Sequence, residues 1–190
     1  MKTSRIHQLI ERLGLLARSE SRRIGSEMAL QPVHVQALQY LERCNRYSNT
    51  PAALVGYLGQ TKGTVSQSLK LLAREGYLEK RTDPEDARVV RLHLTPKAHQ
   101  ALRQLPPTET WMHAERTLSP SERKALTAGL ESLLKALQAA HGGRTFGICS
   151  TCRHFQNGVG EEHRCGLTGE VLTDDDSRRI CQEHEERRSA

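Results

Sequence analysis

Four cysteines near the end of the chain have the spacing expected of ligands to one metal centre. They follow the pattern C-x2-C-x12-C-x15-C and are Cys149, Cys152, Cys165 and Cys181. A Cys-x2-Cys turn presents two thiolates to one ion, and two further soft ligands complete a tetrahedron. Zinc and iron–sulfur clusters both accept four thiolates, so the pattern predicts a metal site without identifying the metal. His184 is an alternate ligand, which would join the first pair and Cys181 and leave Cys165 spare.

The segment that carries these cysteines is interpreted as a separate unit. Gly142-Gly143 interrupts the chain before it, which divides the protein into residues 1–143 and a Cys-rich module at 144–190. The module has few apolar side chains, so it is not expected to fold by hydrophobic burial alone. It would be stabilised either by a structural zinc ion or by an iron–sulfur cluster that acts as a redox sensor. Phe155, Gly166-Leu167 and the acidic run at 174–176 also resemble the four-cysteine domains of some glycyl-radical enzyme accessory subunits. That resemblance implies an iron–sulfur cluster.

Other reactive side chains have simpler interpretations. His154 and His163 lie near the cysteines but are expected to be exposed loop histidines. The run at 174–176 lacks the spaced oxygen ligands of a calcium loop and is expected to begin a helix. Cys44 is expected to be a small buried hydrophobic residue rather than a reactive thiol.

A second set of residues, between Thr61 and Glu75, has the types that contact DNA. Val65, Leu69 and Leu72 recur at helical spacing, so the opposite face of this helix is predicted to be polar. Hydroxyl, amide and cationic side chains on that face can read base edges or contact phosphates. The predicted DNA-contacting residues here are Thr61, Lys62, Thr64, Ser66, Gln67, Lys70 and Arg74.

A basic β-hairpin is predicted directly after this helix. Strand candidates at 77–81 and 90–94 flank the turn Asp83-Pro84-Glu85-Asp86. Arg88 at the tip can enter a narrow minor groove, with Asp83 or Asp86 to orient it, and Arg81 adds a further cation. Two short helices joined by a tight turn and followed by a basic hairpin have the layout of a winged helix-turn-helix.

The elements that must position these residues are mostly helical. A first helix is expected from Ser4 to Arg23, interrupted at Gly25-Ser26, and others from Pro32, Pro51, Thr61 and Pro96. Pro106-Pro107 is expected to break or kink the helix from Pro96, which reaches about Leu105, and Trp111 and Met112 beyond it are assigned to interface packing. The capping box Ser119-Pro120-Ser121-Glu122 begins a last helix that reaches Ala140. The predicted fold class is mainly α (α+β): a winged helix-turn-helix domain with N- and C-terminal dimerisation helices, plus a small metal-stapled tail.

Several motifs between about residue 28 and residue 105 resemble one known family. They are Leu54-x3-Leu58-Gly59, Thr64-Val65-Ser66, the run 72–81, and the run 83–88 leading to Leu94-Thr95. Together they resemble the MarR family of bacterial transcriptional regulators. The resemblance implies a homodimer in which the first and last helices pack together, with the helix from Thr61 in the major groove and Arg88 in the minor groove of a palindromic site. Relatives commonly carry Arg at the positions of Gln67 and Leu71, so this sequence is less basic there and the resemblance does not imply phosphate contacts by these two residues. Leu71 is a candidate for packing on a neighbour.

These observations predict a sequence-specific DNA-binding transcriptional regulator, with repression as the expected mode and a small-molecule or redox effector as a candidate. The expected operator is an inverted repeat with half-site centres about 10 bp, or ~34–36 Å, apart. The competing hypothesis is a thiol–disulfide or metal-handling protein that uses Cys149-x2-Cys152 and binds nucleic acid without specificity. Such redox motifs use a βαβ setting that is not found here. Phosphate-loop, nucleophile-elbow and paired-histidine motifs are also missing from the sequence, so we expect no enzymatic activity.

Composition agrees with a basic DNA-binding protein. The 190 residues include 28 Lys and Arg against 22 Asp and Glu, a net charge of +6. Divided after Arg144, the charge is +9 upstream and −3 downstream, so the DNA-facing surface is expected upstream. No apolar stretch approaches the ~20 residues of a membrane span. Five cysteines without a secretory signal favour a reducing compartment, so we expect a cytoplasmic protein with no membrane partner.

Overall fold

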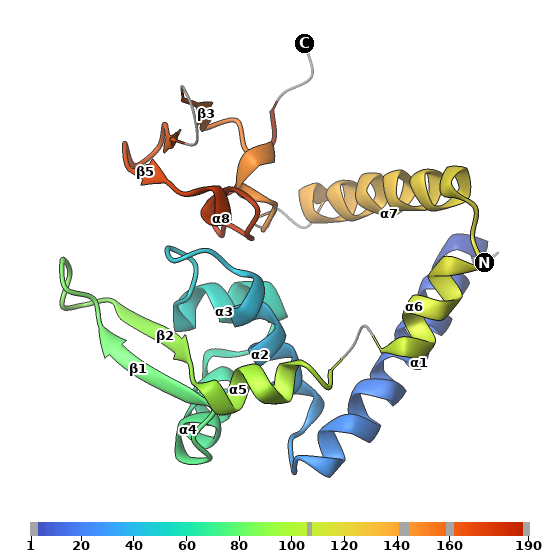
Figure 1. The fold of residues 1–190 in the computed structure, drawn as a ribbon, viewed down its shortest axis with the longest axis horizontal. Coiled ribbons are helices and arrows are strands. Elements are labelled where there is room, and N and C mark those ends of the chain that lie inside the picture. Colours follow the sequence, from blue (N-terminus) through green and yellow to red (C-terminus); the bar gives the residue numbers. More distant parts are fainter. Residues whose placement is uncertain (1–3, 106–107, 141–144, 159–161, 188–190) are drawn as a thin grey trace.

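The computed structural model describes residues 4–105, 108–140, 145–158 and 162–187. Figure 1 shows a body of short helices with a long β-hairpin, a group of outer helices, and a tail that lies over the body. Pro106-Pro107 and Gly142-Gly143, which were expected to interrupt the helical pattern, lie outside the described residues.

The body contains four helices and one hairpin around a buried core. Its elements are α2 (Pro32–Arg43), α3 (Pro51–Leu58), α4 (Lys62–Arg74), β1 (Leu78–Thr82), β2 (Val90–Leu94) and α5 (Pro96–Leu102). The side chains of Val35, Leu38, Leu54 and Leu72 are completely buried. Burial of an aliphatic side chain of this size contributes about 1.5–3 kcal/mol, so the core can hold the body together.

Capping residues set the ends of α3 and α4. Thr50 Oγ1 accepts a hydrogen bond from the Ala53 N–H at 3.2 Å, ahead of Pro51 in the first turn of α3. Gly59 ends this helix with φ at 61°, a left-handed conformation that glycine adopts without strain. Thr61 then begins α4 by accepting a hydrogen bond from the Thr64 N–H at 3.2 Å. The predicted starts of both helices are confirmed.

The hairpin β1–β2 forms the wing of the winged helix. Its strands pair antiparallel, with Leu78 opposite Leu94 and Thr82 opposite Val90. The first strand is one residue further along the chain than predicted. The turn is folded by Asp83, which accepts a hydrogen bond from Arg91 Nε at 2.6 Å and two more from the backbone N–H groups of Glu85 and Asp86 at 2.9 and 3.1 Å.

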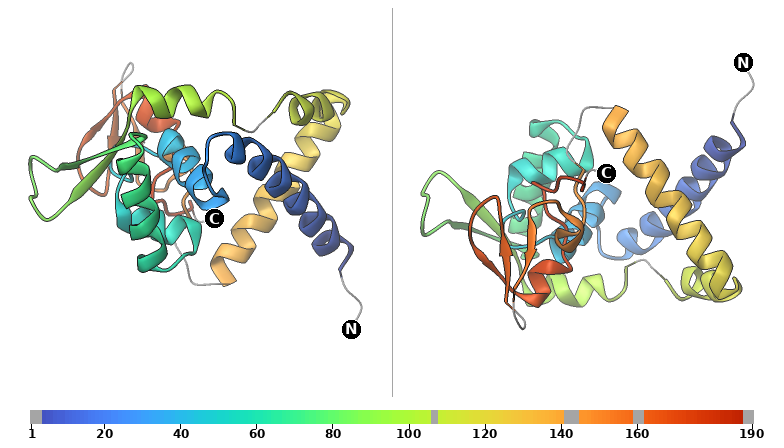
Figure 2. Two further views of the ribbon diagram at one scale, coloured as in Figure 1. Left: turned by 90° about the horizontal axis from the view of Figure 1, so that it is seen from below. Right: turned by 90° about the horizontal axis from the view of Figure 1, so that it is seen from above.

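Three outer helices project from the body on the side away from the wing (Figure 1, Figure 2). They are α1 (Arg5–Glu27), α6 (Glu109–Arg116) and α7 (Pro120–Ala140). The predicted capping box of α7 is confirmed, because Ser119 Oγ accepts from the Glu122 N–H at 3.2 Å and the Glu122 carboxylate accepts from the Ser119 N–H at 2.8 Å. The apolar stripes of α1 and α7 are exposed and comprise Ile6, Leu9, Ile10, Leu13, Leu16, Leu126, Leu130, Leu134 and Leu137.

One prediction about the outer helices was wrong, and one helix was not predicted. The first helix continues through Gly25-Ser26 to Glu27 instead of ending before them. A Cβ atom at Gly25 would lie 2.7 Å from the Leu30 carbonyl oxygen, so this glycine allows the following chain to fold back closely against the helix. The helix α6 was not predicted, although Thr108 caps it and Trp111 Nε1 donates to Glu115 Oε1 at 2.7 Å across one turn. Trp111 and Met112 therefore lie on a helix, partly exposed.

The tail is a small antiparallel sheet with short helical turns. It contains η1 (Cys149–Thr151), β3 (Phe155–Asn157), β4 (His163–Cys165), β5 (Val171–Leu172) and α8 (Asp174–Ser177), with the sheet order β3-β4-β5. The acidic run begins α8 as predicted, because the Thr173 and Asp176 side chains cap each other's backbone N–H groups. Ile180 is buried in the same core as Cys44 of the body, which confirms that Cys44 is a buried residue.

Within the described ranges, every helix is too short or too polar to cross a lipid bilayer.

Candidate functional site

The outward face of α4 is polar and cationic, as predicted from the spacing of its apolar residues. Val65, Leu69 and Leu72 face inward and are at most 2% exposed. The side chains predicted to contact DNA are all classed as exposed: Thr61, Lys62, Thr64, Ser66, Gln67, Lys70, Arg74, and Arg81 and Arg88 on the wing. The structure therefore brings seven of these nine residues onto one helix face or its first turn, and the other two onto the adjacent hairpin.

Thr61 and Thr64 serve first to stabilise the start of α4. Besides capping the Thr64 N–H, the Thr61 hydroxyl lies 3.0 Å from the Thr64 hydroxyl. Both side chains are exposed beyond this contact. The positive end of the helix dipole lies here, where it favours a phosphate group.

Arg74 and Arg81 form ion pairs with carboxylates on the protein surface. Arg74 is 3.0 Å from Glu75, and Arg81 is 2.7 Å from Glu79. Exposed pairs of this kind are worth little, about 0–1 kcal/mol, so they can be exchanged for phosphate contacts at low cost.

The tip of the wing presents Arg88 in a fixed orientation. Its Nε and Nη2 atoms donate to the two carboxylate oxygens of Asp86 at 2.9 and 2.8 Å, while the side chain is 90% exposed. Hydrogen bonds from Arg88 lower the pKa of Asp86, so the carboxylate stays charged near neutrality. Of the two candidates for orienting Arg88, the structure selects Asp86. Asp83 binds Arg91 instead, and that hydrogen bond lowers the pKa of Asp83.

Leu71, which the sequence suggested would pack on a neighbour and not bind phosphate, contacts the body core. It is half-buried there. Gln67 and Leu71 line a hollow of about 520 Å³ between α4 and the start of α2, together with Gln31 and His34. Lys70 and Arg74 line the same hollow, so the uncharged side chains of Gln67 and Leu71 lie among cationic ones.

Arg91 has a role that the sequence did not reveal. From β2 its Nη1 donates to the carbonyl oxygens of Arg46 and Tyr47 at 3.0 and 3.1 Å, while its Nε holds Asp83. The Leu92 N–H adds a hydrogen bond to the Asn49 carbonyl at 2.8 Å. The wing is thus anchored to the segment between α2 and α3, which we call the α2–α3 loop (residues 44–49).

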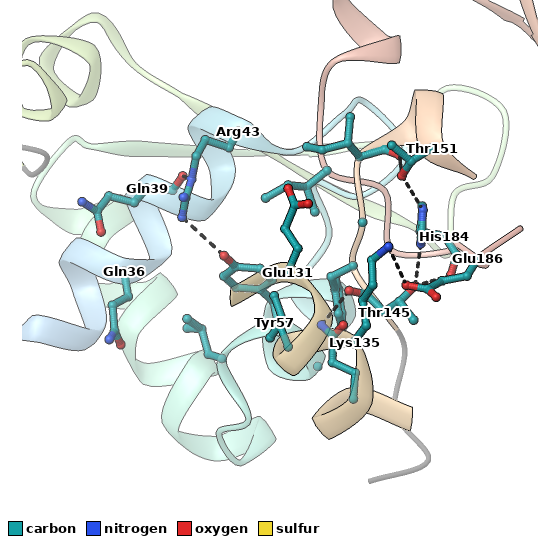
Figure 3. Close-up of a pocket in the computed structure, with 18 residues that line it drawn as sticks. Gln36, Gln39, Arg43, Tyr57, Glu131, Lys135, Thr145, Thr151, His184 and Glu186 are labelled. Atoms are coloured by element: carbon teal, nitrogen blue, oxygen red, sulfur yellow. Dashed lines mark hydrogen bonds and ion pairs between the residues drawn. The ribbon is translucent and has the colours of Figure 1, made fainter. Parts of the chain in front are cut away.

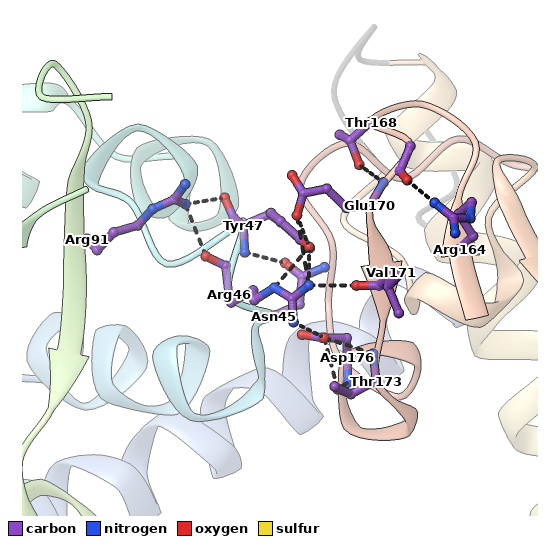
Figure 4. A network of polar contacts seen from close by, with 11 residues as sticks. Asn45, Arg46, Tyr47, Arg91, Arg164, Thr168, Glu170, Val171, Thr173 and Asp176 are labelled. Carbon is purple, nitrogen blue, oxygen red and sulfur yellow. Dashed lines mark hydrogen bonds and ion pairs between the residues drawn. The ribbon is translucent and has the colours of Figure 1, made fainter. Parts of the chain in front are cut away.

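The tail binds the opposite side of the same loop, as Figure 4 shows. Arg46 donates to Asp176 at 2.8 Å and to the Val171 carbonyl at 2.7 Å, and the Tyr47 hydroxyl donates to Glu170. Backbone bonds continue the contact: Asn45 N–H to the Ile180 carbonyl and Ile180 N–H to the Arg43 carbonyl, both at 2.9 Å. The loop therefore joins the tail to the wing.

The four tail cysteines surround one small cavity, which we call the cysteine cavity. It has a volume of about 40 Å³ and is lined by Cys149, Cys152, Cys165 and Cys181 together with apolar side chains that include Phe155, Leu167 and Leu172. Burial raises the pKa of Cys149 to about 12, and the neighbouring thiols act in the same direction. Among the residues that the structure describes, no three Cys, His, Asp or Glu side chains form a ready-made site for a single metal ion.

His184, the alternate ligand, lies away from the cysteine cavity. Its ring nitrogens are 2.6 Å from Thr145 Oγ1 and 2.9 Å from Thr151 Oγ1, and burial lowers its pKa. Both nitrogens are thus engaged by hydroxyl groups, which the sequence could not show. The structure brings Cys165 to the cavity in place of this histidine.

The expectation that His154 and His163 are exposed was wrong. Their side chains are 21% and 17% exposed. His154 lines the cysteine cavity, whereas His163 lies on β4 and packs its ring 4.9 Å from that of Phe155. His154 lies in the turn before β3 and faces Glu185, and strand pairing brings His163 to Phe155; neither contact could be read from the cysteine spacing.

A larger pocket lies between the body, α7 and the tail (Figure 3). It has a volume of about 850 Å³ and is lined by polar side chains such as Gln36, Arg43, Glu131 and Lys135 together with Tyr57 and Phe146. Arg43 donates to the Tyr57 hydroxyl at 3.3 Å, and Lys135 pairs with Glu186 at 3.5 Å. The lining residues come from distant parts of the sequence, so nothing in the sequence indicated this pocket.

The α4 face, its two-helix scaffold and the wing define a winged helix-turn-helix protein. Residues 30–89 match the model of the MarR family. The chain is 32% identical over 103 residues to the transcriptional repressor MprA of Escherichia coli K12, which covers 53% of this chain and 58% of that protein. It therefore spans somewhat more than half the length of this curated relative.

Solved structures share the same fold. A MarR protein from Peptoclostridium difficile superimposes with a TM-score of 0.61 at 22% identity, covering 74% of this chain and 93% of that one. For FabT of Streptococcus pneumoniae in complex with DNA the TM-score is 0.57 at 24% identity, with 70% and 95% covered. For the MepR–DNA complex of Staphylococcus aureus it is 0.56 at 21% identity, with 72% and 100% covered. The chain has the MarR-type winged helix-turn-helix fold.

Proposed function

We propose that this protein is a sequence-specific DNA-binding transcriptional regulator that acts as a homodimer. The observation that carries the proposal is the pairing of two surfaces: the exposed polar face of α4, and Arg88 held by Asp86 at the tip of the wing. In this arrangement Ser66 and Gln67 read base edges in the major groove, while Lys62, Lys70 and Arg74 bind phosphates. Arg88 enters the adjacent minor groove.

The homodimer is supported by the exposed apolar stripes of α1 and α7. Leu9, Leu13, Leu130 and Leu134 are 44–56% exposed, and a stripe of this size in a folded helix favours a partner surface. A second copy of the chain offers the same stripe, which a two-fold interface requires. The two α4 helices would then lie about one DNA turn apart, on an inverted repeat with half-site centres about 10 bp apart.

Repression is the proposed mode because the curated relative MprA is named a transcriptional repressor. The pocket in Figure 3 supports a small-molecule effector, because its volume of about 850 Å³ falls in the range of ligand sites and it lies between the body and α7. A regulator of this kind acts in the cytoplasm, where the operator lies.

The alternative, a thiol–disulfide protein using Cys149 and Cys152, receives no support from the site. Thiolates are the reactive form in exchange chemistry, and their pKa values are lowered in proteins that perform it. Here burial raises the pKa of Cys149 to about 12, and both cysteines are no more than 6% exposed.

The test is binding to an operator selected from random DNA, measured by fluorescence anisotropy against a scrambled sequence. We expect Arg88→Ala to weaken operator binding by at least about fivefold, because it removes the minor-groove cation. Arg116→Ala is the matched control: its guanidinium is also exposed and paired with a carboxylate, Glu109 at 3.3 Å, but lies on α6. Equal affinity for operator and scrambled DNA would refute sequence-specific recognition.

Light scattering on the same sample tests the dimer. The chain mass is 21.3 kDa, so a homodimer has twice that value. Replacing Leu130 and Leu134 of α7 by Glu should give monomers with weaker operator binding. A wild-type monomer that still shifts the operator would contradict the symmetric arrangement.

A further inference from the structure

We propose that Cys149, Cys152, Cys165 and Cys181 bind an iron–sulfur cluster, and that the bound cluster fixes the wing through the α2–α3 loop. The first half concerns the tail alone. The second half rests on the proposed DNA-binding function.

The cysteine cavity has the features of a cluster site. Its four thiols come from three separate segments: Cys149 begins η1 and Cys152 follows it, Cys165 ends β4, and Cys181 follows Ile180. The chain thus folds around a common centre and not along one loop. Apolar side chains, including Phe155 and Leu172, line the cavity beside the thiols, and Tyr47, His154, Thr168 and Glu183 complete its walls. Hydrophobic surroundings of this kind limit the access of water to a metal centre.

Several N–H donors, including the backbone of Glu183 at Cys181, are already directed at the sulfur atoms. The Glu185 N–H donates to Cys152 Sγ at 3.4 Å. The side-chain amide of Asn45 lies beside the Cys181 sulfur, and its Nδ2 atom is buried without a well-formed hydrogen bond among the described residues. Asn45 is 1% exposed, so an unused donor at this place is costly. A thiolate that is bound to iron would give it a charged acceptor.

The size of the cysteine cavity favours a cluster over a single zinc ion. Zinc draws four sulfurs to within about 2.3 Å of one point. Here the four thiols line a common cavity of about 40 Å³, which has room for more than a single ion between them. In a [4Fe–4S] cluster each cysteine binds a different iron, so the sulfurs stand apart around an inorganic core.

The cluster site is continuous with the wing through short contacts. Gln182, next to Cys181, donates its N–H to Ser48 Oγ at 2.8 Å, and Ser48 Oγ donates to Asn45 Oδ1 at 2.7 Å. Arg46 of the same loop holds Asp176 of the tail. On the other side, Arg91 of β2 binds the Arg46 and Tyr47 carbonyls. Loss of the cluster would release the segment after α8, which carries Ile180 and Cys181, and leave the α2–α3 loop, and hence Arg91, without its support.

The first experiment measures iron, acid-labile sulfide and zinc in the full chain purified without oxygen. We expect brown protein with about four iron and four sulfide per chain, as for a [4Fe–4S] cluster. Cys165→Ser should lose the iron, whereas Cys44→Ala should keep it, because Cys44 is the fifth cysteine and lies in the body core. His184→Gln should also keep it.

Colourless protein with one zinc per chain, or a metal-free tail that is folded, would overturn the cluster. Equal loss of iron in His184→Gln and Cys165→Ser would overturn the ligand set. Circular dichroism of each variant shows whether the body is intact. Removal of the cluster from the wild-type protein with a chelator provides a second cluster-free sample that carries no substitution.

The second experiment compares operator affinity with and without the cluster. We expect cluster-free protein to bind about 5- to 150-fold more weakly, the usual range of coupling between two sites. Arg46→Ala should retain iron, but its operator affinity with the cluster should be close to its affinity without the cluster. Arg178→Ala is the matched control, since Arg178 pairs with Asp174 within the tail. If cluster loss weakens operator binding as much in Arg46→Ala as in the wild type, the path through the loop is refuted. If no sample binds the operator, the DNA-binding function is refuted while the iron result stands.

Discussion

The body and the tail are held together by different kinds of interaction. In the body, a core of apolar side chains is completely buried, including Val35, Leu38, Leu54 and Leu72. Among the described tail residues, the buried apolar side chains are Cys149, Cys152, Leu172 and Ile180, and the last of these packs in the body core. The body can therefore fold by hydrophobic burial, whereas the tail depends on docking, capping and its thiols.

The largest expected effect is a loss of stability when a buried leucine is removed from the body, compared with the same change in the tail. Leu54→Ala removes a completely buried side chain from the body, and we expect it to lower the free energy of unfolding by about 2–5 kcal/mol. Leu172→Ala, the matched change in the tail, should loosen the small sheet and leave the main unfolding transition nearly unchanged. Urea unfolding followed by circular dichroism measures the first effect, and limited proteolysis of the tail measures the second. If both variants shift the main transition equally, the two regions unfold as one unit.

An intermediate effect is expected at the contact between the regions. Asp176 caps α8 and also binds Arg46 at 2.8 Å. Asp176→Ala should destabilise the tail by about 1–2 kcal/mol, the usual cost of losing such a cap. Hydrogen exchange of the α8 amides measures this change. Asp176→Asn keeps a capping oxygen but loses the charge, so exchange as fast as in Asp176→Ala would show that the ion pair, and not the cap, provides the stability.

The smallest effect concerns the wing and depends on pH. The hydrogen bond from Arg91, followed by those from the Glu85 and Asp86 N–H groups, lowers the pKa of Asp83. The folded state therefore favours the carboxylate, and its contribution is present above the ordinary pKa of Asp and is lost as the pH falls through the lowered value. NMR should show faster exchange of the Val89 and Leu92 amides over that acidic range. In Asp83→Asn these amides should exchange faster at neutral pH already, and a pH profile identical to the wild type would refute this role of Asp83.

Much of the body could be predicted because its signals are local. Thr50-Pro51, Gly59, Thr61 and Gly76 mark helix ends through backbone geometry that depends on neighbouring residues only. The polar face of α4 followed from the positions of three apolar residues. The helix α6 was overlooked because it has only eight residues, few of them apolar, and buries no side chain completely.

The connection between the tail and the wing could not be predicted, since it depends on residues far apart in the sequence. Arg46 and Asp176 are separated by 130 positions, and Arg91 binds carbonyl oxygens, which leave no trace in residue types. For the same reason the sequence left Cys165 and His184 as alternatives. The hydroxyl groups of Thr145 and Thr151 occupy the histidine, and that arrangement arises only in the folded tail.

The close approach at Gly25 fixes the angle at which the long helix α1 leaves the body. The helix has 23 residues and is about 34 Å long, and its pivot is the point where Gly25 meets the Leu30 carbonyl. A side chain there would have to push the two segments apart. A tilt of only about 5° at the pivot would move the far end of the helix by about 3 Å. In the proposed homodimer that displacement would be passed on to the separation of the two α4 helices, so a residue that contacts no DNA would set the operator spacing that the protein can accept.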